Sequence, residues 1–269
     1  MTGAYNEGTA SCLYSFGGGV TFKYNGLRNL YMVTIVAISG GEIGRPGTKK
    51  EILLIDKRII ALTGKPHPNL LFVPTASSDS DGYCAVAEQY FAKLGARVRH
   101  LRIIRDKPSK AEMRAAVKVA DIVYVGGGNT KDMLRIWTRT GFSTILRSFE
   151  ETKKIYCGVS AGAVCWFDSA WSDSLRMKDP NAPYVCIPCL GIVPGMYNPH
   201  AVREPKRLPA LKAYLKKHGG VAYSVDDCAA IVVHKGEATI LSAKRGRAAS
   251  IILAQHGCLT NTRVPKAHS

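Results

Sequence analysis

A serine lies between two glycines where a buried strand is expected to end. The segment GVSAG (158–162) carries Ser160 at its centre, follows the apolar run 155–157 and leads into apolar residues of helical type. A G-x-S-x-G segment between a strand and a helix is a nucleophile elbow, a sharp turn that holds the serine hydroxyl out of the sheet. Ser160 is therefore the candidate nucleophile for an acyl transfer, with the Ala161 N–H as a candidate donor to the oxyanion.

A serine hydroxyl needs a base, and His200 is the histidine best placed to act as one. It ends the segment PGMYNPH (194–200), 40 residues after Ser160, whose prolines and glycine argue against a regular helix or a central strand. The other six histidines lie in the tail, in or beside strands, in a loop or at a helix end. A loop histidine beyond a strand can take and return a proton, so we expect His200 to be the general base.

A carboxylate should fix the tautomer of this histidine. Asp168 and Asp173 follow Ser160 by 8 and 13 residues, and either gives the chain order Ser, Asp, His. An ordinary α/β-hydrolase separates its serine and histidine by far more than 40 residues, so the spacing disfavours that fold. The residues alone leave both aspartates open.

A second glycine-rich segment, GGGNT (126–130), follows the apolar run 122–125 and precedes a helix expected from Lys131. Glycines in such a place let backbone N–H groups point at an anion or at a carbonyl oxygen that becomes one. The spacing matches neither a P-loop nor a G-x-G-x-x-G fingerprint. A tight turn and an oxyanion site fit the segment equally well.

The three segments VGGGNT (125–130), GVSAGA (158–163) and PGMYNPH (194–200), in this order and spacing, resemble the peptidase E (aspartyl dipeptidase) family of serine peptidases, relatives of the cyanophycinases. The likeness covers about residues 32–257 and implies a class I glutamine amidotransferase-like fold. It implies Ser160 as nucleophile, His200 as base and Asp173 as the acid, with Asp168 in reserve. It also implies an oxyanion hole formed by the N–H groups of Gly128 and Ala161.

The resemblance further implies where a substrate would bind. Family members that prefer an N-terminal aspartate are thought to pair its carboxylate with an arginine beyond the histidine loop. Arg203 and Arg207 lie in that part of the chain, and we expect Asn129 to contact the substrate as well. Arginine suits a fork-like grip on a carboxylate, but a basic helix face explains the two arginines equally well.

Strand-like and helix-like segments alternate through the chain, which predicts a mainly parallel sheet covered by helices on both faces, a three-layer α/β sandwich. The expected strands are 32–38, 70–74, 98–104, 122–125 and 155–158, and the expected helices are 51–63, 82–94, 110–119, 131–140, 143–153 and 203–217. The later strands 221–225, 229–234 and 239–241 are joined by short turns and are expected to form a C-terminal meander or hairpin addition.

Residues 1–31 show neither the helical nor the strand spacing of apolar residues. We therefore expect an N-terminal extension outside the core and one hydrolase domain over 32–269. The extension lacks the apolar stretch of a secretory signal and is poor in arginine for a transit peptide. No stretch of the sequence approaches 18 uninterrupted apolar residues, so we expect no membrane-spanning helix. We expect a cytoplasmic protein.

The chain carries a formal net charge of +17, from 37 Lys and Arg against 20 Asp and Glu. The basic runs 97–118 and 203–217 have amphipathic or strand-like spacing without interleaved aromatics, so we interpret them as solvated faces and do not expect a nucleic-acid partner. The single pair Cys186-x-x-Cys189 lacks a second pair, and we expect thiols there rather than a metal site. No cofactor is expected, and a homodimer is compatible with the sequence.

The resemblance implies a serine-type exopeptidase that hydrolyses short peptides, among them dipeptides with an N-terminal aspartate, through an acyl-enzyme. One alternative is cyanophycinase-like hydrolysis of β-linked aspartyl-arginine units. Another is a non-catalytic member of the fold that binds an anion through the basic patches.

Overall fold

The computed structural model describes residues 33–149, 153–234, 237–255 and 257–264. The first described strand, β1 (Thr34–Ile38), lies within the range expected from the sequence. The proposed N-terminal extension lies outside the described residues. None of the helices in the described ranges is long and apolar enough to cross a membrane.

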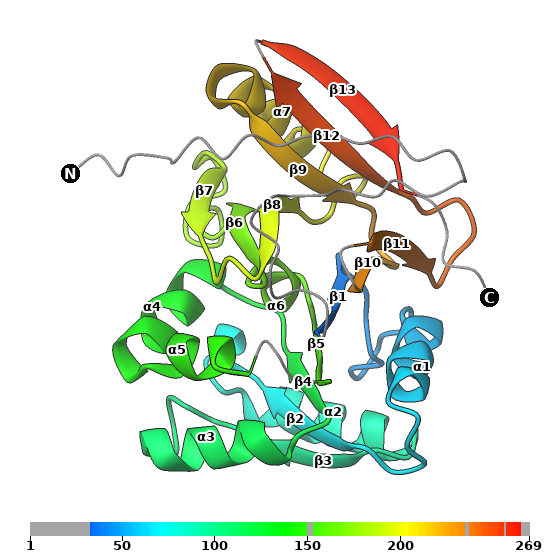
Figure 1. Cartoon of the computed structure of the whole chain (residues 1–269), viewed down its shortest axis with the longest axis vertical. Coiled ribbons are helices and arrows are strands. Elements are labelled where there is room, and N and C mark those ends of the chain that lie inside the picture. Colours follow the sequence, from blue (N-terminus) through cyan, green and yellow to red (C-terminus); the bar gives the residue numbers. More distant parts are fainter. Residues whose placement is uncertain (1–32, 150–152, 235–236, 256, 265–269) are drawn as a thin grey trace.

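A seven-stranded sheet forms the centre of the molecule, with strand order β11-β10-β1-β5-β4-β2-β3 (Figure 1). Its strands are β1, β2 (Asn69–Val73), β3 (Arg97–His100), β4 (Ile122–Val125), β5 (Ile155–Val159), β10 (Ala229–His234) and β11 (Glu237–Ser242). The first five run parallel to one another, whereas β10 and β11 are a hairpin that pairs antiparallel with β1. Five strands are parallel because helices connect them, as the alternating sequence pattern predicts.

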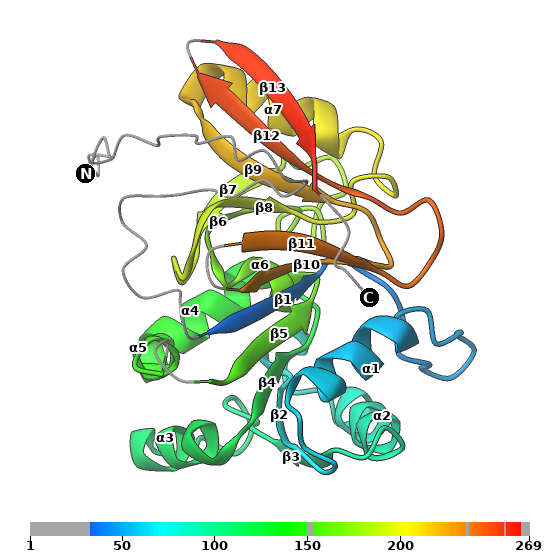
Figure 2. The same cartoon turned by 45° about the vertical axis from the view of Figure 1, so that its right-hand side comes forward.

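Helices cover both faces of this sheet. The helices α1 (Leu53–Leu62) and α2 (Asp81–Ala92) pack on one face. The opposite face carries α3 (Lys110–Val119), α4 (Thr130–Thr140), α5 (Phe142–Arg147) and α6 (Ala161–Val164). Successive β1 residues alternate between the two cores, Val36 facing one and Ala37 the other. The three-layer α/β sandwich predicted from the sequence is confirmed (Figures 1 and 2).

A second sheet stacks beyond the end of the first sheet that is formed by β11 and β10, as Figure 2 shows. Its order is β13-β12-β9-β8-β6-β7. Its strands are β6 (Phe167–Ser172), β7 (Val185–Pro188), β8 (Val193–Asn198), β9 (Gly220–Val225), β12 (Ala249–Gln255) and β13 (Cys258–Arg263), and α7 (Arg207–His218) packs on it. The expected C-terminal meander is thus divided, with β9 in the second sheet and the β10–β11 hairpin in the first.

The segment that leads to His200 differs from the sequence-based expectation. Residues 193–198 form β8, a central strand between β6 and β9, although they contain Pro194 and Gly195. The proline is tolerated because the pairing with β6 is irregular at this end, and β8 pairs with β9 only from Met196 onward. Prolines therefore did not exclude a central strand here.

A carboxylic acid lies in the core between α1 and α2. Asp56 is fully buried, and its Oδ2 accepts a hydrogen bond of 2.8 Å from the Tyr90 hydroxyl. Burial raises the pKa of Asp56 to about 7, because a charged carboxylate is poorly solvated among apolar side chains. The folded protein thus holds this proton at pH values where the unfolded chain has released it.

We expect this proton to make the stability fall as the pH rises. Between the ordinary pKa of 3.8 and about 7, the folded state binds more protons at Asp56 than the unfolded state. The free energy of unfolding should therefore decrease across this window, by roughly 4 kcal/mol for this group, and level off above it. Asp56→Asn keeps the shape and removes the titration. Urea unfolding from pH 4 to 8 should show a flatter profile for this variant, and parallel profiles would contradict the assignment.

Candidate active site

The predicted elbow is present at the end of β5. Ser160 has φ 54° and ψ −113°, outside the usual regions for a residue with a side chain, and α6 begins at Ala161. A Cβ at Gly158 would lie 2.5 Å from the Val125 carbonyl oxygen, and one at Gly162 would lie 2.1 Å from it. Both flanking residues must be glycine because the turn packs directly against the end of β4.

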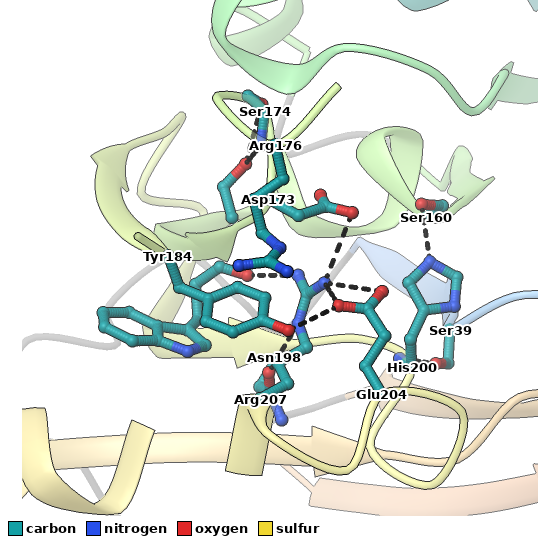
Figure 3. A network of polar contacts seen from close by, with 12 residues as sticks. Ser39, Ser160, Asp173, Ser174, Arg176, Tyr184, Asn198, His200, Glu204 and Arg207 are labelled. Carbon is teal, nitrogen blue, oxygen red and sulfur yellow. Dashed lines mark hydrogen bonds and ion pairs between the residues drawn. The ribbon is translucent and has the colours of Figure 1, made fainter. Parts of the chain in front are cut away.

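The structure brings His200 to Ser160, as expected from the sequence. Ser160 Oγ and His200 Nε2 are 3.0 Å apart, within proton-transfer distance (Figure 3). Ser160 follows a strand of the first sheet, whereas His200 follows β8 of the second sheet. The pair therefore lies where the carboxyl ends of strands from the two sheets meet.

The carboxylate beside His200 is Asp227. Its Oδ1 lies 2.6 Å from His200 Nδ1, the ring nitrogen opposite the one that faces Ser160. Asp227 lies in the turn between β9 and β10, where the chain passes from the second sheet to the first. Burial raises its pKa, but the hydrogen bond with His200 and the charges of His200, Arg203 and Arg247 outweigh this, so the pKa is below its ordinary value. A charged carboxylate there favours the Nδ1–H tautomer.

The structure places neither Asp173, the expected acid, nor Asp168, its reserve, against His200. Asp173 Oδ2 lies 3.5 Å from Arg207 Nη1, and Asp168 Oδ2 accepts a 2.8 Å hydrogen bond from the Gly195 N–H. Triads occur in several chain orders, so the acid need not lie between the serine and the histidine in the sequence. The available signal was Asp226-Asp227, acidic residues directly after a predicted strand.

The glycine loop after β4 lies against the elbow. A Cβ at Gly127 would be 3.6 Å from Ser160 Cβ, and Gly128 has φ +145° with no room for a side chain beside the Ala76 carbonyl. Within the described ranges, the N–H groups of Gly128 and Ala161 donate to no other backbone or side-chain group. Both predicted oxyanion donors are therefore uncommitted within that part of the chain.

Asn129 does not have a free side chain for a substrate. Its Oδ1 accepts a 3.0 Å hydrogen bond from the Asp132 N–H, which caps α4, and its Nδ2 donates to the Ser174 carbonyl over 3.3 Å. Both ends of the amide are thus engaged. The structure favours a structural role in joining the glycine loop to the turn after β6.

Arg207 is likewise an internal residue, contrary to its predicted role in substrate binding. It is 1% exposed and reaches the Asn198 side chain through Nε (3.0 Å), Glu204 through Nη1 (3.2 Å) and the Trp171 carbonyl through Nη2 (Figure 3). Arg203, in contrast, is exposed in the turn after His200 and lies near enough to Asp227 to lower its pKa. Of the two arginines, only Arg203 has a solvent-accessible side chain.

An elbow serine, a histidine and a carboxylate in successive contact on an α/β sandwich define a class of hydrolytic enzymes. The model of Peptidase family S51 matches residues 35–241. The chain belongs to this family and is therefore a peptidase.

Similar proteins agree with this placement. The protein named "Uncharacterized peptidase YgaJ" of Bacillus subtilis is 30% identical over 228 residues, 84% of this chain and 94% of that one. A "Peptidase E" of Streptomyces coelicolor is 34% identical over 134 residues, 49% of this chain and 50% of that one. The crystal structure of a peptidase from an acI-B1 Actinobacterium has the same fold, with a TM-score of 0.65, 18% identity and coverage of 89% and 97% of the two chains.

Proposed function

We propose that this S51 peptidase works through an acyl-enzyme on Ser160, with His200 as general base and acid and Asp227 as the residue that orients His200. The observation that carries the proposal is the continuous chain of contacts from Ser160 Oγ to His200 Nε2 (3.0 Å) and from His200 Nδ1 to Asp227 Oδ1 (2.6 Å). A protein that only binds an anion has no need of this arrangement.

The proposed reaction has two halves. His200 Nε2 takes the proton of Ser160 Oγ as the oxygen attacks the scissile carbonyl carbon, and the N–H groups of Gly128 and Ala161 hold the negative oxygen that forms. His200 then gives the proton to the leaving amine, and the C–N bond breaks. In the second half His200 takes a proton from water, whose oxygen attacks the ester carbon. The proton returns to Ser160 as the acid product leaves.

The proposed substrates are short peptides, with dipeptides carrying an N-terminal aspartate as the first class to test. Arg203 supports this choice, because it is exposed in the turn after His200 and its charge acts on Asp227, so its guanidinium is available to an acidic side chain of a substrate. Because Arg207 is buried, Arg203 is the arginine of this pair that can contact the side chain of an N-terminal aspartate.

A dipeptide panel with Asp, Glu, Ala and Lys as the first residue, combined with a fluorophosphonate probe, tests the proposed function. We expect the wild type to react covalently with the probe and to cleave Asp-first peptides fastest. Arg203→Gln should lower kcat/KM for Asp-first peptides about 10- to 100-fold, the loss expected for one charge-assisted hydrogen bond.

The Ala-first peptides are the internal control, since Arg203→Gln should leave their hydrolysis nearly unchanged. An equal loss for both peptides would remove Arg203 from specificity. Absence of probe labelling and of hydrolysis in the wild type would refute the serine mechanism.

A further inference from the structure

The end of β1 contacts both reacting residues of the proposed triad. The Ile38 carbonyl accepts a 2.9 Å hydrogen bond from the Ser160 N–H. The next residue, Ser39, accepts a 2.7 Å hydrogen bond from the His200 N–H through its hydroxyl (Figure 3). Ile38, the last residue of β1, and Ser39, which follows it, thus hold the backbones of the nucleophile and of the base.

The next residue, Gly40, lies against Asp227, the third residue of the proposed triad. A Cβ at Gly40 would lie 2.2 Å from Asp227 Oδ1 and 2.7 Å from His200 Nδ1, the two atoms of the imidazole–carboxylate hydrogen bond. The Gly40 carbonyl also accepts a 2.8 Å hydrogen bond from the Cys228 N–H, which follows Asp227 directly. The His200 and Asp227 pair therefore lies in space that only a glycine leaves open.

The Ser39 hydroxyl donates one hydrogen bond and accepts another, both with backbone groups. Ser39 is fully buried, and its Oγ donates to the Val225 carbonyl over 2.8 Å. Because the Ser39 O–H points at the Val225 carbonyl, a lone pair of Ser39 Oγ is free to accept the hydrogen bond from the His200 N–H. The same Val225 carbonyl accepts the Ala201 N–H over 3.1 Å, so one short region ties β1, β9 and the His200 turn together.

This connection matters because the triad comes from two sheets. Ser160 follows a strand of the first sheet and His200 follows a strand of the second, so the hydrogen bonds between strands within either sheet do not fix their separation. In addition, His200 has φ 57°, a conformation that is unfavourable for a non-glycine residue and that persists only when its surroundings hold it. The Ser39 hydroxyl is the group bonded to the N–H of that strained residue.

We infer that Ser39 and Gly40 are positioning residues of the active site: Ser39 holds the backbone of His200 in reach of Ser160, and Gly40 leaves the space in which His200 meets Asp227. The inference rests on the proposed function for its catalytic meaning. The contacts themselves can be tested without activity, through the far-downfield proton resonance of a short imidazole–carboxylate hydrogen bond.

For Ser39 the test compares Ser39→Ala with Ser39→Thr, which keeps the hydroxyl. We expect Ser39→Ala to slow fluorophosphonate labelling about 10- to 100-fold, the loss typical of a misplaced catalytic group, and to weaken or shift the downfield resonance. Ser39→Thr should recover most of both signals. Equal impairment of the two variants at equal thermal stability, or an unaltered Ser39→Ala protein, would overturn the role of the hydroxyl.

For Gly40 the test is Gly40→Ala against Gly82→Ala, a glycine at the start of α2 whose added Cβ would meet nothing within 4 Å. We expect Gly40→Ala to lose the downfield resonance and Gly82→Ala to keep it. Retention of the resonance in folded Gly40→Ala would overturn the inference. If the wild type shows the resonance but neither labels nor hydrolyses, the proposed function fails while the positioning contacts stand.

Discussion

Ser160→Ala is expected to lower kcat by about five to six orders of magnitude, the loss found when a serine nucleophile is removed. Alanine keeps the Cβ and removes only the Oγ that lies 3.0 Å from His200 Nε2. The fold should persist, because the turn is held by backbone hydrogen bonds from Ser160 to Ile38 and within α6. The measurement is kcat on the best dipeptide of the panel, together with probe labelling and a thermal melt.

The matched control is Ser148→Ala, at the C-terminal end of α5, whose hydroxyl donates to the Ile145 carbonyl and accepts from the Arg114 side chain. It should label and hydrolyse like the wild type. Residual labelling of Ser160→Ala at the wild-type rate would place the reactive nucleophile elsewhere and contradict the proposed mechanism.

Asp227→Asn is expected to lower kcat by about four orders of magnitude, while Asp173→Asn should cost less than about tenfold. The amide has the shape of the carboxylate, but it lacks the charge that stabilises an imidazolium. It can also donate to His200 Nδ1 and so impose the tautomer that cannot accept the Ser160 proton. Asp173 in contrast contacts Arg207, so its change should act only indirectly.

Steady-state kinetics of the two asparagine variants on one peptide check this ranking. Because the pKa of Asp227 is lowered, its carboxylate should remain charged throughout the neutral range, and the gap between the variants should not close there. The reverse ranking, with Asp173→Asn the more damaging change, would restore Asp173 as the acid and remove Asp227 from the mechanism.

Local features of the sequence were sufficient for the elbow and the parallel sheet. The turn at Ser160 needs glycine two positions before and two positions after the serine, and the five-residue segment 158–162 contains both. Alternating strand and helix periods likewise predict a parallel sheet, because parallel neighbours require crossover connections. His200 was identified by elimination among seven histidines, and the structure places it against Ser160.

The acid, the second sheet and the separation of the two arginines were decided only by the tertiary structure. Asp227 follows His200 by 27 residues and reaches it because β9 belongs to one sheet and β10 to the other. Strand pairing between distant segments depends on which faces must be buried together, and no local spacing records it. For the same reason Arg203 and Arg207, four positions apart in one basic run, differ completely: one is exposed beside the triad, and the other is a buried partner of Glu204 and Asn198.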